Sequence, residues 1–150
     1  DGEAISSSRI RESLKVGDFK TVNTLLGYNF STAEKVISGK KLGRTLGFPT
    51  LNLPCDLPLP PPYGVYHVRA KGVTGTYVPA IANFGLRPSV ESTQIPLLEV
   101  HLLQDHCPFN TGDFLEVEWL QFIRPEMKFE SVEALKRQIS LDCQAPFPNL

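Results

Sequence analysis

The chain has 150 residues, 41% of them hydrophobic, which is enough for one domain with a single hydrophobic core. Its formal net charge of -1 argues against a protein that coats nucleic acid, because binding along a phosphate backbone needs a broad basic surface. No apolar run approaches the ~20 residues of a membrane span, and the first residues lack the apolar core of a secretory signal. We therefore expect a cytoplasmic protein that binds neither nucleic acid nor a membrane.

The cysteines favour a reducing compartment. Cys55, Cys107 and Cys143 are widely separated and form no C-x-x-C pair, so neither a disulfide framework nor a structural zinc site is indicated. His106 lies beside Cys107 without a second cluster, and we assign this pair no metal-binding role.

Two short helices are expected near the N-terminus, over residues 6–26. Gly17 followed by Asp18 supplies a break and an N-cap between two runs of helical periodicity. The apolar positions of these runs are Ile10, Leu14, Phe19, Val22, Leu25 and Leu26.

From residue 30 onward the apolar pattern has a period of two, which is typical of strands. Gly, Pro, Asn and Asp clusters separate the segments, and no helical pattern lies between them, so we expect an antiparallel barrel. In the last segment, simple alternation places Trp119 and Phe122 on opposite faces, one filling the barrel and the other under the final helix. The Pro-rich stretch 53–64 is expected to be a connecting loop. The strand segments are 33–38, 63–72, 76–85, 96–104 and 114–124.

One amphipathic helix is predicted over residues 131–142. Ser131 can cap its N-terminus, and Val132, Leu135 and Ile139 share one face that can pack on the barrel. The predicted fold class is therefore mainly β, with a short helical segment before the barrel and one helix after it.

The stretch "SGKKLGRTLGFPTLN", residues 38–52, combines three glycines with three basic side chains. Such a loop can hold a phosphate against main-chain N–H groups. It is not a Walker loop, because Gly39 and Gly43 are one residue too close and Arg44 stands where that motif has Lys. The alternative is an ordinary solvated connection between two strands.

Thr50 and Asn52 alternate with Leu51, so in an extended chain their side chains face the same way. A hydroxyl and an amide oxygen, together with phosphate oxygens, suit Mg²⁺. The alternative is that both residues serve only the geometry of a turn.

Glu99 is a carboxylate within an apolar strand. Leu98, Val100 and Leu102 form one face, so Glu99 and His101 belong to the other. An exposed strand face explains this arrangement, and so does a general base held at the mouth of a barrel.

Five segments in order resemble riboflavin kinase, in particular the kinase module of bacterial bifunctional FAD synthetases. They are "GRTLGFPTLN", "PPYGVYHVRA", "AIANFGLRPSV", "LEVHLLQ" and "FIRPEMKFESVEALKRQISLD", and the match runs from about residue 30 to residue 142. The resemblance implies a six-stranded antiparallel barrel with a C-terminal helix. It also implies ATP- and Mg²⁺-dependent transfer of the γ-phosphate to the ribityl 5′-hydroxyl of riboflavin, giving FMN and ADP in FMN and FAD biosynthesis.

The same resemblance implies roles for single residues. Glu99 would accept the proton of the 5′-hydroxyl, and Thr50 and Asn52 would hold Mg²⁺ and the transferred phosphate. The flavin side would be formed by Glu99, Arg124 and Phe129. The ATP phosphates would be bound by Gly39, Lys41, Gly43, Arg44, Gly47, Pro49 and Thr50.

The match contains departures. Where the family pattern has "HGDKRGR" this chain has "SGKKLGR", which leaves the roles of that edge of the loop open. Leu51 replaces an alanine, but it faces away from Thr50 and Asn52, so we expect the metal site to survive.

The N-terminal "ISSSRIR" resembles a segment near the end of the adenylyltransferase module that precedes the kinase in bifunctional FAD synthetases, with Arg11 in its last position. We expect residues 1–28 to be the helical tail of that module and residues 29–150 to be the kinase domain. The partner is then an adenylyltransferase domain in cis in a longer protein, and this chain has no adenylyltransferase activity by itself. The alternative is that 1–28 form only a tethering helix pair.

Two functions from other classes compete with a kinase. One is a barrel that binds a flavin or nucleotide without turnover, although such a binder has no use for a base at Glu99. The other is an oligonucleotide-binding barrel, which would interleave aromatic and basic residues on one sheet face, a pattern these strands lack.

Overall fold

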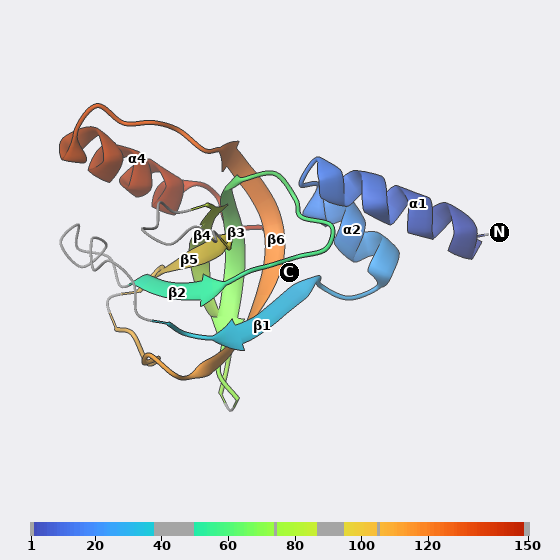
Figure 1. Ribbon diagram of the computed structural model, residues 1–150, viewed down its shortest axis with the longest axis horizontal. Helices are drawn as coiled ribbons and strands as arrows, with labels where there is room; N and C mark the ends of the chain where they lie inside the picture. The colour runs from blue at the N-terminus through green and yellow to red at the C-terminus, as the bar shows by residue number, and fades with distance from the viewer. Residues whose placement is uncertain (1, 38–49, 74, 87–94, 105, 149–150) are drawn as a thin grey trace.

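The computed structural model describes residues 2–37, 50–73, 75–86, 95–104 and 106–148, with only the backbone described for residues 2–6. These ranges contain three helices and six strands (Figure 1). The helices are α1 (Gly2–Lys15), α2 (Phe19–Leu26) and α4 (Val132–Gln144). The strands are β1 (Ser31–Lys35), β2 (Thr50–Pro54), β3 (Gly64–Lys71), β4 (Val78–Gly85), β5 (Leu97–Leu102) and β6 (Phe114–Pro125).

The six described strands form a nearly closed antiparallel barrel in the order β1-β6-β3-β4-β5-β2. An isolated bridge links the two edge strands, because the Ile37 amide donates to the Asn52 carbonyl at 2.8 Å. The predicted fold class is therefore confirmed. The first strand begins two residues earlier than predicted and ends at Lys35. Residues 55–63 connect β2 to β3, so the Pro-rich loop predicted over 53–64 is confirmed except at its ends. Leu53 and Pro54 belong to β2, and Gly64 begins β3.

Alternating side chains of the strands fill the barrel, as the period of two predicted. Trp119, Tyr66 and Phe84 are the large aromatic members of this core, and Tyr66 and Phe84 each contact Trp119 edge-on. The aliphatic members from the strands are Leu51, Leu53, Val68, Val78, Ala70, Ala80, Ala82, Leu98, Val100, Leu102, Leu115 and Val117.

The prediction that Trp119 and Phe122 lie on opposite faces was wrong. Both side chains pack with the barrel core, and the Phe122 ring lies 5.1 Å from the Tyr66 ring. The register between β3 and β6 shifts between His67 and Val68. Tyr66 is opposite Phe122 and Val68 is opposite Trp119, so two residues along β3 correspond to three along β6. Such a bulge inverts the side-chain alternation beyond it, which turns Phe122 inward.

The N-terminal helix pair is packed onto one end of the barrel. Asp18 caps α2 by accepting hydrogen bonds from the amide and the hydroxyl of Thr21, at 3.2 and 2.7 Å. Phe19 and Val22 of α2 are fully buried in the same core as the strands. In Figure 1, α2 lies against β6 and α1 extends away from the barrel.

Helix α4 covers the outer face of β4 and β3. Ser131 caps it by accepting a hydrogen bond from the Ala134 amide at 3.1 Å, as predicted. Ile139 packs on Val65 and Ile81, and these three form a second buried cluster outside the barrel. Figure 1 shows α4 at the opposite side of the barrel from α1 and α2.

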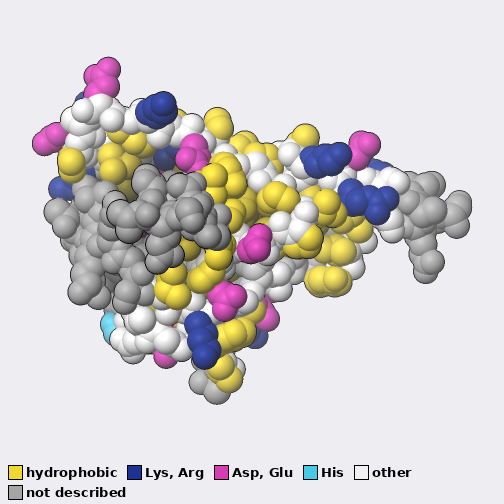
Figure 2. All heavy atoms as spheres, in the orientation of Figure 1, with side chains coloured by type: hydrophobic (Ala, Val, Ile, Leu, Met, Phe, Trp, Pro, Cys, Tyr) yellow, Lys and Arg dark blue, Asp and Glu magenta, His cyan; other side chains and the backbone are white. Residues whose placement is uncertain are grey.

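Figure 2 shows the face on which the β2–β3 connection lies. Hydrophobic side chains gather over this connection, between the barrel and the N-terminal helices. Lys and Arg side chains stand on the N-terminal helices, where Arg9, Arg11, Lys15 and Lys20 are exposed.

Candidate active site

Strand pairing aligns two rows of side chains on the outer face of the barrel. In the first row, Asn52 of β2 is directly opposite Glu99 of β5, which is directly opposite Asn83 of β4. In the second row, Thr50 is opposite His101. Residues directly opposite in adjacent antiparallel strands share a face, so these five polar side chains belong to one surface.

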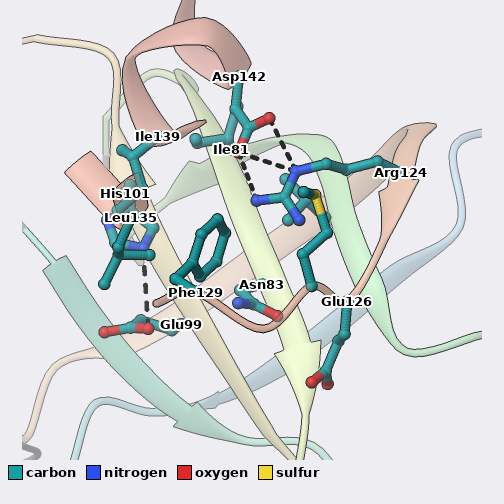
Figure 3. A pocket seen from close by; sticks show the side chains of 12 residues that line it. Ile81, Asn83, Glu99, His101, Arg124, Glu126, Phe129, Leu135, Ile139 and Asp142 are labelled. Atoms are coloured by element: carbon teal, nitrogen blue, oxygen red, sulfur yellow. Dashed lines mark hydrogen bonds and ion pairs between the residues drawn. The ribbon is translucent and has the colours of Figure 1, made fainter. Parts of the chain in front are cut away.

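A cavity lies over this surface, beneath α4 (Figure 3). The strands contribute most of its polar groups, whereas α4 and the segment between β6 and α4 contribute most of its apolar walls together with Glu126 and Asp142. Three residues implicated by the family resemblance line it together, namely Glu99, Arg124 and Phe129. The other lining residues are Val65, Ile81, Asn83, His101, Glu126, Met127, Leu135, Ile139 and Asp142.

Glu99 is half-buried on the wall of this cavity, with a side chain that is 19% exposed. It lies on the outer face of the barrel under α4, and not at the barrel mouth. The Nε2 atom of His101 is 3.8 Å from its Oε1 atom, as the dashed line in Figure 3 marks. The Nδ1 atom of His101 is buried and has no hydrogen-bond partner among the described residues.

Arg124 is held in place by the C-terminal helix. Its Nε and Nη2 atoms donate to the carboxylate of Asp142 at 3.0 and 2.8 Å. Gln138 donates to the same carboxylate at 3.0 Å, and Arg124 Nη1 donates to the carbonyl of Pro125 at 3.1 Å. Paired hydrogen bonds of this kind fix both the position and the plane of a guanidinium.

A glycine and an aromatic ring define the surroundings of Arg124. A methyl group at Gly64 would collide with the Arg124 carbonyl oxygen, so only glycine permits the close approach of β3 and β6 there. The guanidinium carbon of Arg124 is 5.9 Å from the centre of the Phe129 ring, within the range of a cation–π contact. In Figure 3 the Phe129 ring projects into the cavity between α4 and the strands.

Thr50 and Asn52 do not line the cavity. They lie on β2, the strand next to β5, where they are directly opposite His101 and Glu99. The Asn52 side chain is buried and Thr50 is partly exposed. Neutral oxygens beside a carboxylate are hard ligands that fit Mg²⁺ when a substrate supplies further oxygens. Among the described residues, no group of three or more His, Cys, Asp and Glu side chains is placed to hold a metal ion.

The remaining predicted phosphate-binding residues fall in the segment between β1 and β2. Gly39, Lys41, Gly43, Arg44, Gly47 and Pro49 lie outside the described residues.

Three residues of this site were missed from the sequence. Asn83 and His101 face the cavity because of strand pairing, and Asp142 reaches Arg124 from α4. Asp142 carried a usable signal, because it follows Leu135 and Ile139 at helical spacing on the buried stripe. A carboxylate on such a stripe needs a partner.

A family model described as "Flavokinase: Riboflavin kinase" matches residues 26–146. The chain belongs to the riboflavin kinase family. It is 40% identical over 144 residues to a bifunctional riboflavin kinase/FMN adenylyltransferase of Haemophilus influenzae, covering 96% of this chain and 46% of that protein. A protein of the same name from Escherichia coli K12 is 38% identical and covers 94% of this chain. The chain thus spans about half the length of these relatives.

Two solved structures share the fold of this chain. A crystal structure of riboflavin kinase from Trypanosoma brucei shares the fold, with a TM-score of 0.51, 23% identity and coverage of 76% of this chain and 74% of that one. A structure titled as a macrolide-efflux protein from Streptococcus pneumoniae aligns with a TM-score of 0.79 and 31% identity, covering 92% of this chain and 45% of that one. In the described part of this chain, no helix is long and apolar enough to cross a membrane.

Proposed function

We propose that this chain transfers the γ-phosphate of ATP to the ribityl 5′-hydroxyl of riboflavin, giving FMN and ADP. The observation that carries this proposal is the half-buried carboxylate of Glu99, in one cavity with Arg124 and Phe129. A protein that only bound flavin would have no use for such a base. Membership of the riboflavin kinase family supports the same reaction.

Glu99 is the general base. Its carboxylate accepts the proton of the 5′-hydroxyl as the hydroxyl oxygen attacks the γ-phosphorus. One P–O bond forms to the ribityl oxygen, and the bond to the β-phosphate oxygen breaks with ADP as the leaving group. His101, 3.8 Å away, limits the directions in which the carboxylate can turn.

The flavin lies between α4 and the strands. Leu135, Ile139 and Phe129 form apolar walls that suit its flat ring system, and the polar strand residues suit its ribityl chain. Arg124 limits the space on the far side because its guanidinium is fixed by Asp142. The apolar walls of the cavity restrict the access of water, which would compete with the hydroxyl for the phosphoryl group.

Thr50 and Asn52 are the residues that would hold Mg²⁺, together with phosphate oxygens of the nucleotide. When bound, the ion supplies positive charge that stabilises the transferred phosphoryl group. The two side chains share a face with Glu99 and His101, so the proposed metal ligands and the proposed base belong to adjacent strands.

We propose that this chain is part of a longer protein that carries an adenylyltransferase domain in cis, and that this domain uses FMN. The H. influenzae relative bears both activities in its name, and this chain covers 46% of its length. Residues 1–28 would then connect that domain to the kinase domain at 29–150. A cytoplasmic location is consistent with free thiols at Cys55, Cys107 and Cys143 and with ATP as co-substrate.

The proposal is tested by incubating the purified chain with riboflavin, ATP and MgCl₂ and following FMN by chromatography. Formation of FMN that requires ATP and the metal ion supports the kinase. A folded chain that makes no FMN but quenches riboflavin fluorescence would instead be a flavin-binding module.

A further inference from the structure

Asn83 is a cavity residue to which the proposed reaction gives no role. It lies near the end of β4, directly opposite Glu99 of β5, and its side chain lines the cavity beneath α4. Figure 3 shows it on the strand side of the cavity, between Glu99 and Glu126. Its Oδ1 atom is buried and has no hydrogen-bond partner among the described residues.

An unpaired buried amide oxygen destabilises the folded protein, because the oxygen has lost its hydrogen bonds to water without replacement. Nearly all buried polar groups of native proteins are paired, so an exception beside a reactive carboxylate needs an explanation. A ligand that enters the cavity and hydrogen-bonds to the amide would supply one.

The geometry limits what part of a ligand reaches Asn83. Directly opposite residues in an antiparallel pair have Cβ atoms about 5 Å apart. If the ribityl 5′-hydroxyl is at Glu99, the groups beside Asn83 are those one or two carbons along the chain. In riboflavin these carbons carry secondary hydroxyls, which both donate and accept hydrogen bonds, as does an amide.

We propose that Asn83 hydrogen-bonds to the secondary hydroxyls of the ribityl chain nearest its 5′ carbon and thereby selects flavins with a polyol side chain. This inference rests on the proposed kinase function. The isoalloxazine ring of the flavin is a poorer partner for Asn83 than the ribityl chain. Leu135, Ile139 and Phe129 form apolar walls that suit this ring, and these walls lie toward α4 and away from Asn83 and Glu99 on the strands.

The test compares riboflavin with 7,8-dimethyl-10-(5-hydroxypentyl)isoalloxazine, which keeps the terminal hydroxyl but lacks the other three. The ratio of kcat/KM for the two flavins is measured in the parent, Asn83→Leu and Asn83→Ala. We expect the parent to prefer riboflavin, and both variants to lose on the order of tenfold of that preference. The preference should fall because kcat/KM for riboflavin decreases, whereas kcat/KM for the hydroxypentyl flavin should change little.

Gln121→Leu is the matched control, because it also removes an amide from the outer face of the barrel but does not line this cavity. Its ratio should equal that of the parent. Equal ratios in the parent and both Asn83 variants would overturn the inference.

Fluorescence quenching by the same two flavins separates this inference from the kinase assignment. If the parent binds riboflavin but makes no FMN, the ratio of the two dissociation constants still reports on Asn83. Lumiflavin, which has no ribityl chain, should bind equally to the parent and to the variants. A variant that loses lumiflavin binding as well has lost the cavity itself, which would count against a role confined to the hydroxyls.

Discussion

Arg124 at the end of β6 donates two hydrogen bonds to Asp142 near the end of α4, at 3.0 and 2.8 Å. The side chain of Asp142 is 3% exposed and that of Arg124 is 14% exposed, so water screens this ion pair little. The pair ties the C-terminal helix to the barrel directly beside the cavity, and α4 otherwise contacts the strands through a small apolar cluster.

We expect Asp142→Ala to lower the free energy of unfolding by about 3 kcal/mol, because it leaves the Arg124 guanidinium partly buried without its partner. Asp142→Asn should cost less, since the amide oxygen still accepts one hydrogen bond. Urea denaturation measures both changes. Lys136→Ala, on the exposed surface of α4, is the control and should stay within ~0.5 kcal/mol of the parent. An equal, small effect at both positions would show that the ion pair does not hold α4.

Glu99→Gln should lower kcat for FMN formation by ~10²-fold or more, because the amide cannot accept the hydroxyl proton. The KM for riboflavin should change less than kcat, since the side-chain shape is kept. FMN is measured by chromatography at saturating ATP and riboflavin. Glu34→Gln replaces an exposed carboxylate on β1 and should leave the rate unchanged. A Glu99→Gln variant with more than a third of the parent kcat would exclude Glu99 as the base.

Thr50→Val and Asn52→Leu should each raise the Mg²⁺ concentration required for half-maximal rate, on the order of tenfold, because each removes one oxygen from the proposed ligand set. The rate is titrated against MgCl₂ at fixed ATP. Thr111→Val, in the exposed turn before β6, serves as the control. If the Mg²⁺ dependence of both variants matched that of the control, Thr50 and Asn52 would not be metal ligands.

Phe19→Ala should destabilise the chain by about 3–5 kcal/mol. The Phe19 ring is 1% exposed and lies 5.4 Å from the ring of Trp119 and 5.6 Å from that of Tyr66, so truncation leaves a cavity in the barrel core. Thermal and urea unfolding measure the loss. Val16→Ala, at a 65% exposed position in the turn between α1 and α2, should change stability by less than ~0.5 kcal/mol. A small effect at Phe19 would mean that α2 is an appendage rather than part of the core.

His67 makes stability depend on pH. Burial lowers the pKa of its imidazole below the usual value of 6.5, although the hydrogen bond with Gln121, the backbone of Ala145 and the charge of Asp142 oppose this. The unfolded chain therefore binds a proton more readily than the folded chain. The stability contributed by neutral His67 is present above about pH 6.5 and is lost as the pH falls toward the lower folded pKa.

The measurement is the free energy of unfolding at pH 7.5 and pH 5.5 in the parent and in His67→Gln. The parent should lose more stability on acidification than the variant, because glutamine does not titrate. Taking the difference removes the contributions of the acidic residues, which both chains share. Identical losses would show that His67 binds protons equally in the folded and the unfolded chain over this pH range.

Several features followed from local sequence because their physical causes are local. The period of two in residues 96–104 separates Glu99 and His101 from the apolar face, since successive side chains of a strand point to opposite sides. Ser131 caps α4 because its hydroxyl meets an amide three residues later. The roles in phosphate, metal and flavin binding remain predictions, among them those of Thr50 and Asn52.

Other features depended on which distant segments pair, and no local pattern contains that information. The bulge that turns Phe122 into the core exists only because β6 pairs with β3 in a shifted register. The alignment of Asn83 with Glu99 requires β4 and β5 to pair in one register out of several, and a slip of one residue would invert it. Periodicity in the sequence determined which side chains share a face of a strand or helix, and capping residues determined where the helices begin. Tertiary packing decided which of them meet, because burial of the whole core selects one register for all strands at once.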